Sequence, residues 1–360
     1  MQPRQMTETS RPVEPSFTYF MDALLIVACG RSTPKLPTLE RDSGSSRATR
    51  SITRIINTVT TDYRYITSEL LDDGLIARIT LNRPEVRNAQ NRGLLVELND
   101  AFLTAEADED VRVVILAGSG STFSSGHDLG SKEAIAERTR GTKDPTMLIH
   151  GGKKKGAEAR MLQEWHYYFE NHRRWRDLRK ITIASVHGPV LAGGLMLAFV
   201  CDLVVAADDT TFADVVGTRL GMCGLEYFAA PWEFGPRKTK ELLLTGDSLD
   251  ADEAHRLGLV SKVFPRAALT DSTLAFARRI ARLPSVTSLL IKESVNQTQD
   301  NMGFHNALNA CFTIHQLNHS HWAEIHDNKM PAGLPEDGLP HWKDAPPVVN
   351  ASKTEARAGS

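Results

Sequence analysis

Two adjacent glycines stand inside an apolar stretch near the middle of the chain, VLAGGLMLAFVCD at Val190–Asp202. The apolar run from Leu195 to Val200 predicts a buried helix, although glycine is among the poorest helix formers. At a helix start, backbone N–H groups lack partners and carry positive potential, and a missing side chain lets a ligand approach them. The stretch therefore predicts that Gly193 and Gly194 begin a buried helix and offer N–H groups to an anionic ligand in a dry site.

A second glycine-containing turn has matching chemistry. The segment TFSSGHDL at Thr122–Leu129 is typical of a turn between a strand and a helix, so the N–H of His127 is expected to point at the same place as that of Gly193. Two N–H groups from separate turns would form an oxyanion hole, and the loss of one such donor costs about 3 kcal/mol of transition-state stabilisation.

The composition narrows the class of protein. The chain has 360 residues, of which 41% are hydrophobic, and a formal net charge of -2. These values predict a packed core in one large domain or two ordinary ones, and they give no reason to expect nucleic acid or a membrane as a partner. No run approaches the roughly 18 apolar residues that span a bilayer. The cysteines are scattered, which favours free thiols in a reducing cytoplasm; they are Cys29, Cys201, Cys223 and Cys311.

The pattern divides the chain into four parts. Residues 1–60 are expected to be a disordered leader or a stretch upstream of the true start codon, although Ser16–Gly30 also resembles a signal or lipoprotein segment. Residues 61–265 alternate strands and helices and contain a basic insertion at 131–160, in which Lys153, Lys154 and Lys155 suit either a solvated loop or phosphate binding. Residues 266–328 are predicted to be helical, and residues 329–360 to form an extended tail.

The predicted elements follow from apolar periodicity and from turn residues. Strands are expected at Leu75–Pro84, Val111–Gly118, Ile181–Gly188, Asp202–Ala207 and Leu259–Phe264. Helices are expected at Gly93–Asp108, Met161–Leu178, Leu269–Arg282, Ser285–Gln297 and Phe304–His326. A further helix is expected to start at the N-cap Asp250 and to end near Gly258.

Several motifs in order resemble the crotonase (enoyl-CoA hydratase/isomerase) superfamily, from about Tyr63 to about His326. They are ITLNRPEVRNAQN, VRVVILAGSGSTFSSGHDL, ITIASVHGPVLAGGLMLAFVCDLVVAADDTTFAD, LLLTGDSLDADEAHRLGLVSKVFP and LLIKESVN. The resemblance implies an α/β fold, a superhelix of ββα turns with a helical C-terminal region that serves oligomerisation. It also implies a homotrimer or a dimer of trimers, an acyl-CoA thioester as substrate, and no cofactor beyond the coenzyme A of that substrate.

The resemblance implies a role for particular residues. The oxyanion donors would be the N–H groups of His127 and Gly193. Arg83, Arg87 and Asn88 occupy the stretch where basic residues lie near the CoA phosphates, and Lys292 is a further candidate for that role. Each of these four also suits a surface charge or a turn. The other residues expected to line the substrate site are Ser125, Gly126, Asp128, Gly194 and Met196.

The chain departs from the family pattern where hydratases carry two glutamates. One of these positions is Met196, and the other falls at Val216 or Gly217. Water addition that needs one carboxylate to activate water and another to deliver a proton is therefore not expected in its usual form. Met196 is expected to fill volume beside the acyl chain.

Other acids are candidates for the missing catalytic group. Glu226 ranks first, because burial among Leu225, Tyr227 and Phe228 would raise its pKa, although an ion pair with an arginine such as Arg237 is an alternative role. Asp214 ranks second, and the side chain of His127 third. Glu164 and His166 lie on a helix that is expected to approach the acyl pocket.

The histidines near the C-terminus raise the question of a metal site. His315 and His319 are one helical turn apart, and His321 and His326 follow. Because Glu324 is the only acid in this amphipathic segment, no metal site is expected there.

The main functional hypothesis is an enzyme that stabilises a thioester enolate at the His127 and Gly193 amides and isomerises a double bond with one carboxylate. The first alternative is a hydrolase that cleaves a thioester or a β-diketone. The second is a CoA-thioester binding protein without catalysis.

Overall fold

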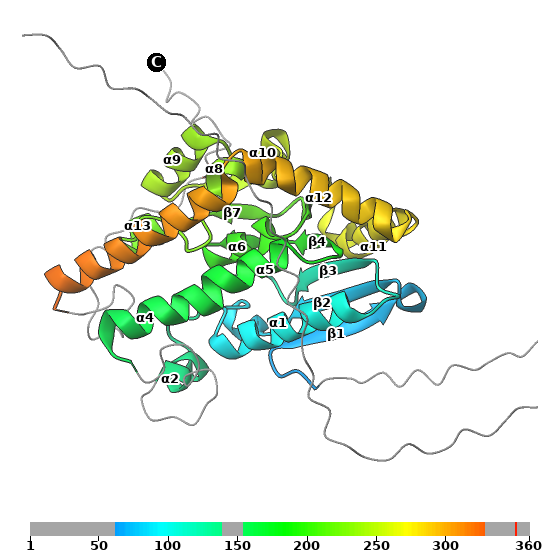
Figure 1. Ribbon diagram of the computed structural model, residues 1–360. Coiled ribbons are helices and arrows are strands. Elements are labelled where there is room, and N and C mark those ends of the chain that lie inside the picture. The colour runs from blue at the N-terminus through cyan, green and yellow to red at the C-terminus, as the bar shows by residue number, and fades with distance from the viewer. Residues whose placement is uncertain (1–61, 139–153, 328–349, 351–360) are drawn as a thin grey trace, which may run out of the picture. The chain divides into compact units, whose positions relative to one another are not determined.

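The computed structural model describes residues 62–138, 154–327 and 350 (Figure 1). The chain divides into two units, residues 1–57 and 58–360, and every described residue belongs to the second. The predicted leader and most of the predicted tail therefore lie outside the described residues, as does the centre of the predicted insertion. At the ends of that insertion the structure has helices α2 (Lys132–Arg138) and α4 (Gly156–Glu164).

A six-stranded sheet forms the frame of the fold. Its strand order is β1-β2-β3-β4-β6-β9, with β1 and β2 antiparallel and the other neighbours parallel. The strands are β1 (Ile66–Leu71), β2 (Ile76–Leu81), β3 (Val113–Gly118), β4 (Ile181–Val186), β6 (Leu203–Ala207) and β9 (Lys262–Phe264). A three-stranded sheet, in the order β5-β7-β8, comprises β5 (Pro189–Leu191), β7 (Thr211–Ala213) and β8 (Ser248–Asp250).

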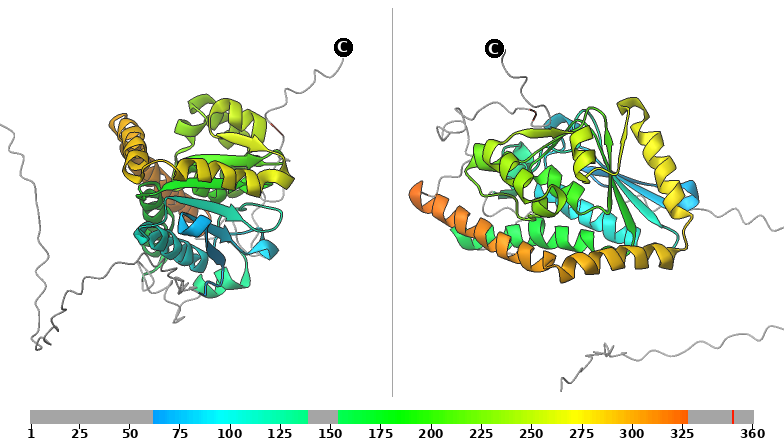
Figure 2. Two further views of the ribbon diagram at one scale, coloured as in Figure 1. Left: turned by 90° about the vertical axis from the view of Figure 1, so that its right-hand side faces the viewer. Right: turned by 90° about the horizontal axis from the view of Figure 1, so that it is seen from above.

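The central strands of the six-stranded sheet are covered on both faces, which explains their continuous apolar runs, whereas the edge strand β1 is mostly exposed. In β3, Val114 and Leu116 pack in the core that contains helix α1 (Arg92–Ala107), whereas Val113 and Ile115 pack in the core that contains α11 (Leu269–Ala281). This alternation is the two-residue period of a strand. Figure 2 shows the sheet between these helices.

The remaining helices connect and cover the strands. Helix α6 (Gly193–Phe199) follows β5, and every residue in it is buried. A long helical segment joins α4 to α5 (Asn171–Arg176) through a π-helical stretch, Trp165–Glu170. The C-terminal helices are α12 (Ser285–Asn301) and α13 (Phe304–Ile325), and α13 lies against α4. The others are α7 (Val216–Leu220), α8 (Ala230–Glu233), α9 (Pro236–Thr245) and α10 (Ala251–Leu257), with short 3-10 turns at Asp72–Gly74, Pro84–Val86 and Arg266–Ala268.

Most of the elements expected from the sequence are present. The side chain of Asp250 accepts a hydrogen bond from the Glu253 N–H, as the prediction of an N-cap requires, and Gly258 ends α10 in the left-handed conformation. The helix predicted at Met161–Leu178 differs from the expectation, since its middle is π-helical. Such stretches are common at functional sites, and no residue pattern in the sequence marked this one.

Candidate functional site

The site begins at the N-terminus of α6, where the residue before the helix, Ala192, has a strained backbone conformation. Ala192 has φ 48° and ψ −119°, a conformation that costs a non-glycine residue about 1–3 kcal/mol. Its N–H donates to the carbonyl of Ala213, and its carbonyl accepts from Leu195. The next residue, Gly193, is the first of the helix, so its N–H has no intrahelical partner. The prediction that the glycine pair begins a buried helix is confirmed.

The turn at Ser124–His127 lies directly against this helix start. Gly126 has φ 90°, and a Cβ built on it would lie 2.9 Å from the Gly193 nitrogen. The carbonyl of Gly126 accepts from the Gln90 N–H, and the Asp128 N–H donates to the Gln90 carbonyl. His127 lies between these two hydrogen bonds and forms a parallel bridge with Gln90. In such a bridge the N–H of His127 points away from Gln90. The two expected oxyanion donors thus belong to backbone segments in contact.

A side chain at either position of the pair would meet a neighbour, a movable ring at Gly193 and fixed backbone at Gly194. A Cβ on Gly193 would lie 2.6 Å from His127 Cδ2 and 2.9 Å from His127 Nε2. A Cβ on Gly194 would lie 2.5 Å from the carbonyl oxygen of Ser124. Gly193 therefore leaves room for the His127 ring, and Gly194 lets α6 pack on the neighbouring backbone.

The His127 side chain is neutral at physiological pH. Burial lowers its pKa to about 3, and its ring stacks on Tyr168 with centroids 3.8 Å apart. Its Nδ1 lies 3.6 Å from Oε1 of Glu226, and its Nε2 is buried without a hydrogen-bond partner among the described residues. Because the ring is uncharged, its contact with Glu226 is not an ion pair.

Glu226 is the carboxylate that the fold brings to His127. It is 4% exposed, and its Oε1 also lies 3.7 Å from Nε2 of His315. Burial, and next the negative charge of Glu164, hold the pKa of Glu226 well above its usual value. Arg237, the partner considered for it from the sequence, lies exposed on α9.

Asp214 lies in a different environment. It lines an apolar cavity together with Leu195 of α6, Ala230 of α8 and Leu242 of α9. Its Oδ1 accepts from the Val216 N–H, and its Oδ2 is buried with no partner among the described residues. Burial raises its pKa to about 7.

Three residues expected at the substrate site form a buried network. The Arg83 guanidinium is 2.7 Å from the Asp128 carboxylate and donates to the Ser131 hydroxyl. The side-chain oxygen of Asn88 accepts a hydrogen bond from the Arg83 backbone N–H, and its side-chain amide donates to the carbonyls of Ser119 and Thr122. The side chains of Arg83, Asn88 and Asp128 thus bond to one another and to nearby turns. These contacts favour a structural role for the three residues, in which they hold the conformation of the turns.

The other two basic candidates differ in exposure. Arg87 is exposed, in the left-handed conformation, beside Ser125, whose N–H donates to the Arg87 carbonyl. Lys292 is 7% exposed, and its Nζ donates to Asp202 and to the Lys180 carbonyl. Lys292 therefore connects α12 to residues that precede strands β4 and β6, whereas the Arg87 side chain faces solvent.

The positions without glutamate are filled by packing. Met196 is fully buried in the main core, and Val216 belongs to the same core. A Cβ on Gly217 would lie 2.8 Å from the carbonyl oxygen of Leu243, so no larger side chain fits there without a shift of the backbone.

Several neighbours of the site gave no signal in the sequence. Gln90 is fully buried, and its Oε1, which has no partner among the described residues, lies 3.1 Å from a Cβ built on Gly193. Tyr168 reaches His127 from the π-helical stretch, and the buried His172, on α5, has its pKa lowered to about 3 by burial. These residues come from separate elements, so only the fold shows that they meet. Glu164, in contrast, was expected from the sequence to lie on a helix that approaches the acyl pocket; it ends α4, with Oε2 3.7 Å from Nε2 of His315, which also lies 3.7 Å from Glu226.

The chain was compared with known proteins. A family model described as enoyl-CoA hydratase/isomerase matches residues 72–345. The Mycobacterium tuberculosis protein named "Putative enoyl-CoA hydratase EchA13" is 62% identical over 293 residues, which are 81% of this chain and 92% of that protein. The crystal structure of a probable enoyl-CoA hydratase from Mycobacterium smegmatis has a TM-score of 0.64 and 39% identity over 72% of this chain and 97% of that one.

A third relative carries a different name. The 4-chlorobenzoyl coenzyme A dehalogenase-2 of Arthrobacter sp is 28% identical over 254 residues, 69% of this chain and 85% of that protein. The match to the family model covers most of the chain, and the motifs that first suggested the resemblance all lie within it. The chain belongs to the enoyl-CoA hydratase/isomerase family of the crotonase superfamily and has its fold.

Proposed function

We propose that the chain processes an acyl-CoA thioester by holding the thioester oxygen at the N–H groups of His127 and Gly193. The observation that carries the proposal is the contact of the Gly126–His127 turn with the Gly193 nitrogen, beside the Glu226 carboxyl. Negative charge that develops on the oxygen would be stabilised by donors that are already in place and shielded from water. Coenzyme A enters as part of the substrate, and the proposal needs no separate cofactor.

The reaction that fits one carboxylate is the isomerisation of a 3-enoyl thioester. The ionised form of Glu226 takes the proton from C2, and the electron pair of that bond enters a dienolate whose oxygen is held by the two amides. The same carboxyl then returns the proton to C4, which leaves the double bond between C2 and C3. Burial that raises the pKa of Glu226 makes it a stronger base, as removal of a carbon-bound proton requires.

Hydration in the usual form is disfavoured for steric reasons. The two expected glutamate positions hold core residues or a glycine without room for a side chain. The name of the Arthrobacter relative, a 4-chlorobenzoyl-CoA dehalogenase, indicates that similar chains can be named for other reactions of acyl-CoA. Hydrolysis and binding without catalysis are the outcomes against which the proposal is tested.

The test compares three thioesters with one protein. A 3-enoyl-CoA, crotonyl-CoA and a saturated acyl-CoA are each mixed with purified protein, while conjugated thioester absorbance and free thiol are followed. Isomerisation is expected, and Glu226→Gln should lower its rate by about 10²–10⁴-fold. Glu233→Gln is the matched control, because burial also raises the pKa of Glu233, to about 7, and the charged group that acts on it is Arg176 rather than a group at His127.

Each competing function has its own signature. Thiol release from the saturated thioester would indicate a hydrolase, and tight binding without turnover of any thioester would indicate a binding protein. Rapid hydration of crotonyl-CoA would contradict the argument from Met196.

The proposal extends to assembly and location. No helix in the described part of the chain is long and apolar enough to cross a membrane. We propose a homotrimer or a dimer of trimers, supported by exposed apolar side chains on α12, and a cytoplasmic location, supported by free thiols. The α12 side chains are Val286, Leu290, Ile291 and Val295. The described free thiols are Cys201, Cys223 and Cys311.

A further inference from the structure

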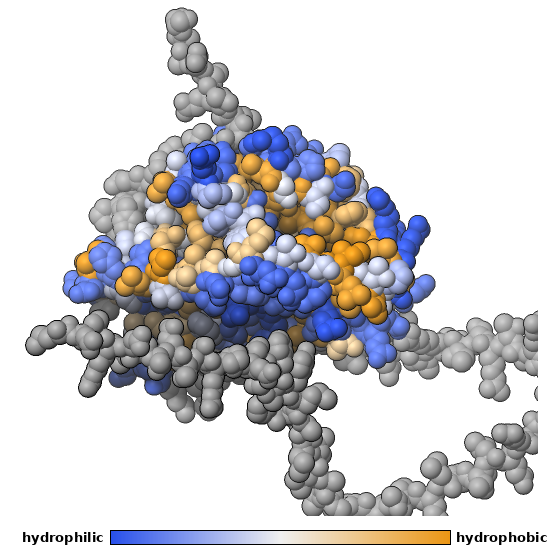
Figure 3. All heavy atoms as spheres, turned by 45° about the horizontal axis from the view of Figure 1, so that its top comes forward, coloured by the Kyte–Doolittle hydropathy of each residue, from blue (hydrophilic) through white to orange (hydrophobic). Residues whose placement is uncertain are grey.

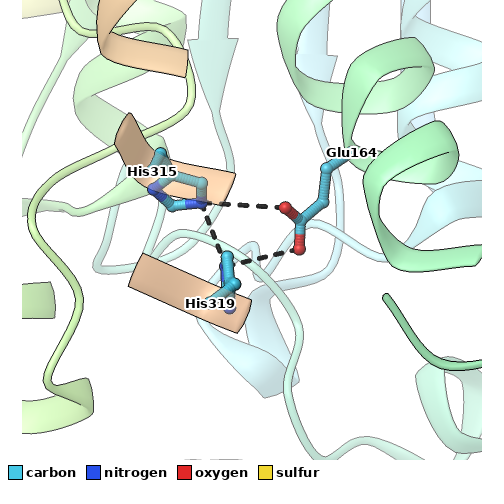
Figure 4. Close-up of side chains that lie close together, drawn as sticks. All are labelled: Glu164, His315 and His319. Carbon is cyan, nitrogen blue, oxygen red and sulfur yellow. Dashed lines mark hydrogen bonds and ion pairs between the residues drawn. The ribbon is translucent and has the colours of Figure 1, made fainter. Parts of the chain in front are cut away.

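Three ligand-type side chains converge beside the proposed acyl site. Glu164 at the end of α4 faces His315 and His319, which lie one turn apart on α13 (Figure 4). The Nε2 atoms of the two histidines are 3.0 Å apart, and the Glu164 oxygens lie 3.5 Å from His319 and 3.7 Å from His315. The sequence offered no acid for these histidines because Glu164 belongs to a distant segment of the chain.

The spacing leaves room for a metal ion: only the contact between the two histidines, at 3.0 Å, is short enough for a hydrogen bond. Hydrogen bonds between such atoms are about 2.7–3.2 Å long, so the two contacts of Glu164 are too long for them. Ligands at about 2.0–2.2 Å from a tetrahedral Zn²⁺ are about 3.3–3.6 Å from one another. The separation of the two histidine nitrogens, 3.0 Å, lies just below that range, and the two Glu164 distances, 3.5 Å from Oε1 to His319 and 3.7 Å from Oε2 to His315, lie within and just above it.

The orientation of the groups supports the same reading. Nδ1 of His315 is 2.9 Å from the Gly224 carbonyl, which can only accept, so Nδ1 carries the proton and Nε2 presents its lone pair to the cluster. The Gln316 amide donates to Oε2 of Glu164 at 2.6 Å and orients the carboxylate. Metal ligands are commonly held by such outer bonds.

The charges around the cluster are mixed. Arg160 and Arg92 act on Glu164 with positive charge, which opposes a cation. Loss of the Glu164 proton when a metal binds would offset part of that charge, and the Glu226 carboxyl lies nearby, 3.7 Å from Nε2 of His315. The histidines are 4% and 8% exposed and the Glu164 side chain 12%, so the cluster is shielded but reached by solvent at one edge.

We propose that Glu164, His315 and His319 bind one divalent transition-metal ion, with Zn²⁺ as the best fit. Two imidazoles and a carboxylate suit zinc, and three protein ligands leave a fourth position for water or a substrate oxygen. The ion lies next to Glu226 and hence at the edge of the proposed acyl site. The inference stands independently of the proposed reaction, because ion binding is measured without substrate.

The test uses the full-length chain, stripped with a chelator and titrated with Co²⁺ alone. Wild type should bind one ion per chain and develop the strong visible absorption of a tetrahedral Co²⁺ site. Glu164→Gln and His319→Ala should lose this absorption, and Gln316→Ala should weaken binding about 10–100-fold. His321→Ala, an exposed histidine on the same helix, is the matched control and should bind as wild type does.

Two results would overturn the assignment. One is a wild type that binds no stoichiometric ion, and the other is a Glu164→Gln variant, folded by circular dichroism, that binds as wild type does. Glu226→Gln separates this inference from the proposed reaction, since it should keep the ion and lose isomerisation. Loss of the ion in Glu226→Gln would overturn the three-ligand set.

Discussion

At the scale of single residues, burial decides which groups around His127 carry charge. It lowers the pKa of His127 to about 3 and that of His315 to about 4, so both imidazoles are neutral at pH 7. It raises the pKa of Glu164 and of Asp214 to about 7. Water is the better solvent for charge, so each buried group shifts toward its neutral form.

Asp214 provides a test of this rule, since it lies in an apolar cavity. Its carboxyl has a pKa of 3.8 when unfolded and about 7 when folded. Between about pH 4 and pH 7 the unfolded state releases this proton and the folded state keeps it, so the stability contributed by Asp214 falls as pH rises. At about 1.4 kcal/mol per pKa unit, the cost reaches about 4 kcal/mol above pH 7.

Asp214→Asn should remove that cost and keep the bond from the Val216 N–H. The variant is expected to be more stable than wild type at pH 8 and to lose this advantage as the pH falls to 4. Denaturant unfolding across this pH range measures the difference. An advantage that does not change with pH would mean that the folded carboxyl titrates normally.

The glycine pair permits a second prediction at this scale. Gly194→Ala sets a Cβ against the backbone of Ser124, so it should destabilise the fold by about 1–3 kcal/mol. Gly193→Ala meets the His127 ring, which can move, so it should lose less stability but most of the activity. Gly130→Ala, with nothing within 4 Å of its Cβ, is the control for both. Unfolding midpoints and turnover rates check these expectations, which would fail if Gly194→Ala were as stable as Gly130→Ala.

At the scale of elements, the apolar strands and the amphipathic helices were predictable from periodicity alone. Strands β2, β3, β4 and β6 lie where the apolar runs placed them, because both sheet faces are covered. The π-helical stretch was not predictable, since its residues have no special composition. The roles of charged residues were also hidden: Arg83 and Lys292 look like surface charges in the sequence, and their buried partners come from distant segments.

The buried pair of Lys292 and Asp202 joins α12 to the sheet and gives a prediction for that contact. Lys292→Met leaves a buried carboxylate unpaired, so it should cost about 3–5 kcal/mol of stability. Lys238→Met breaks the partly exposed pair of Lys238 with Glu241 and should cost under about 1 kcal/mol. Unfolding free energies and the KM for acyl-CoA are the measurements. If Lys292→Met raised the KM and left the stability unchanged, the structural role would be contradicted and a role of Lys292 in binding the CoA phosphates would be favoured.

At the scale of the whole molecule, the motifs identified the family because several of them occur in the right order. The site was only partly predictable. The convergence of the two turns followed from their glycines, and Glu164 was expected on a helix that approaches the acyl pocket, whereas Gln90 and Tyr168 reach the site only through the fold. Figure 3 shows apolar side chains gathered on one face of the molecule. Helix α12 also exposes apolar side chains that are spaced by one helical turn, as in Val286 and Leu290.

This exposed stripe predicts self-association through α12. The double variant Leu290→Glu, Ile291→Glu places charge in the stripe and should dissociate the proposed trimer. Leu244→Glu changes a side chain on α9 that is 79% exposed and should leave the assembly intact. Sedimentation equilibrium gives the mass of each. A double variant with the mass of wild type would move the contact elsewhere.

The most direct test of the central claim is a crystal structure with a bound, unreactive acyl-CoA thioester analogue. The account predicts that the carbonyl oxygen lies within hydrogen-bond distance of both the His127 and Gly193 nitrogens, with the Glu226 carboxyl facing C2. A carbonyl oxygen that contacts neither nitrogen would contradict it.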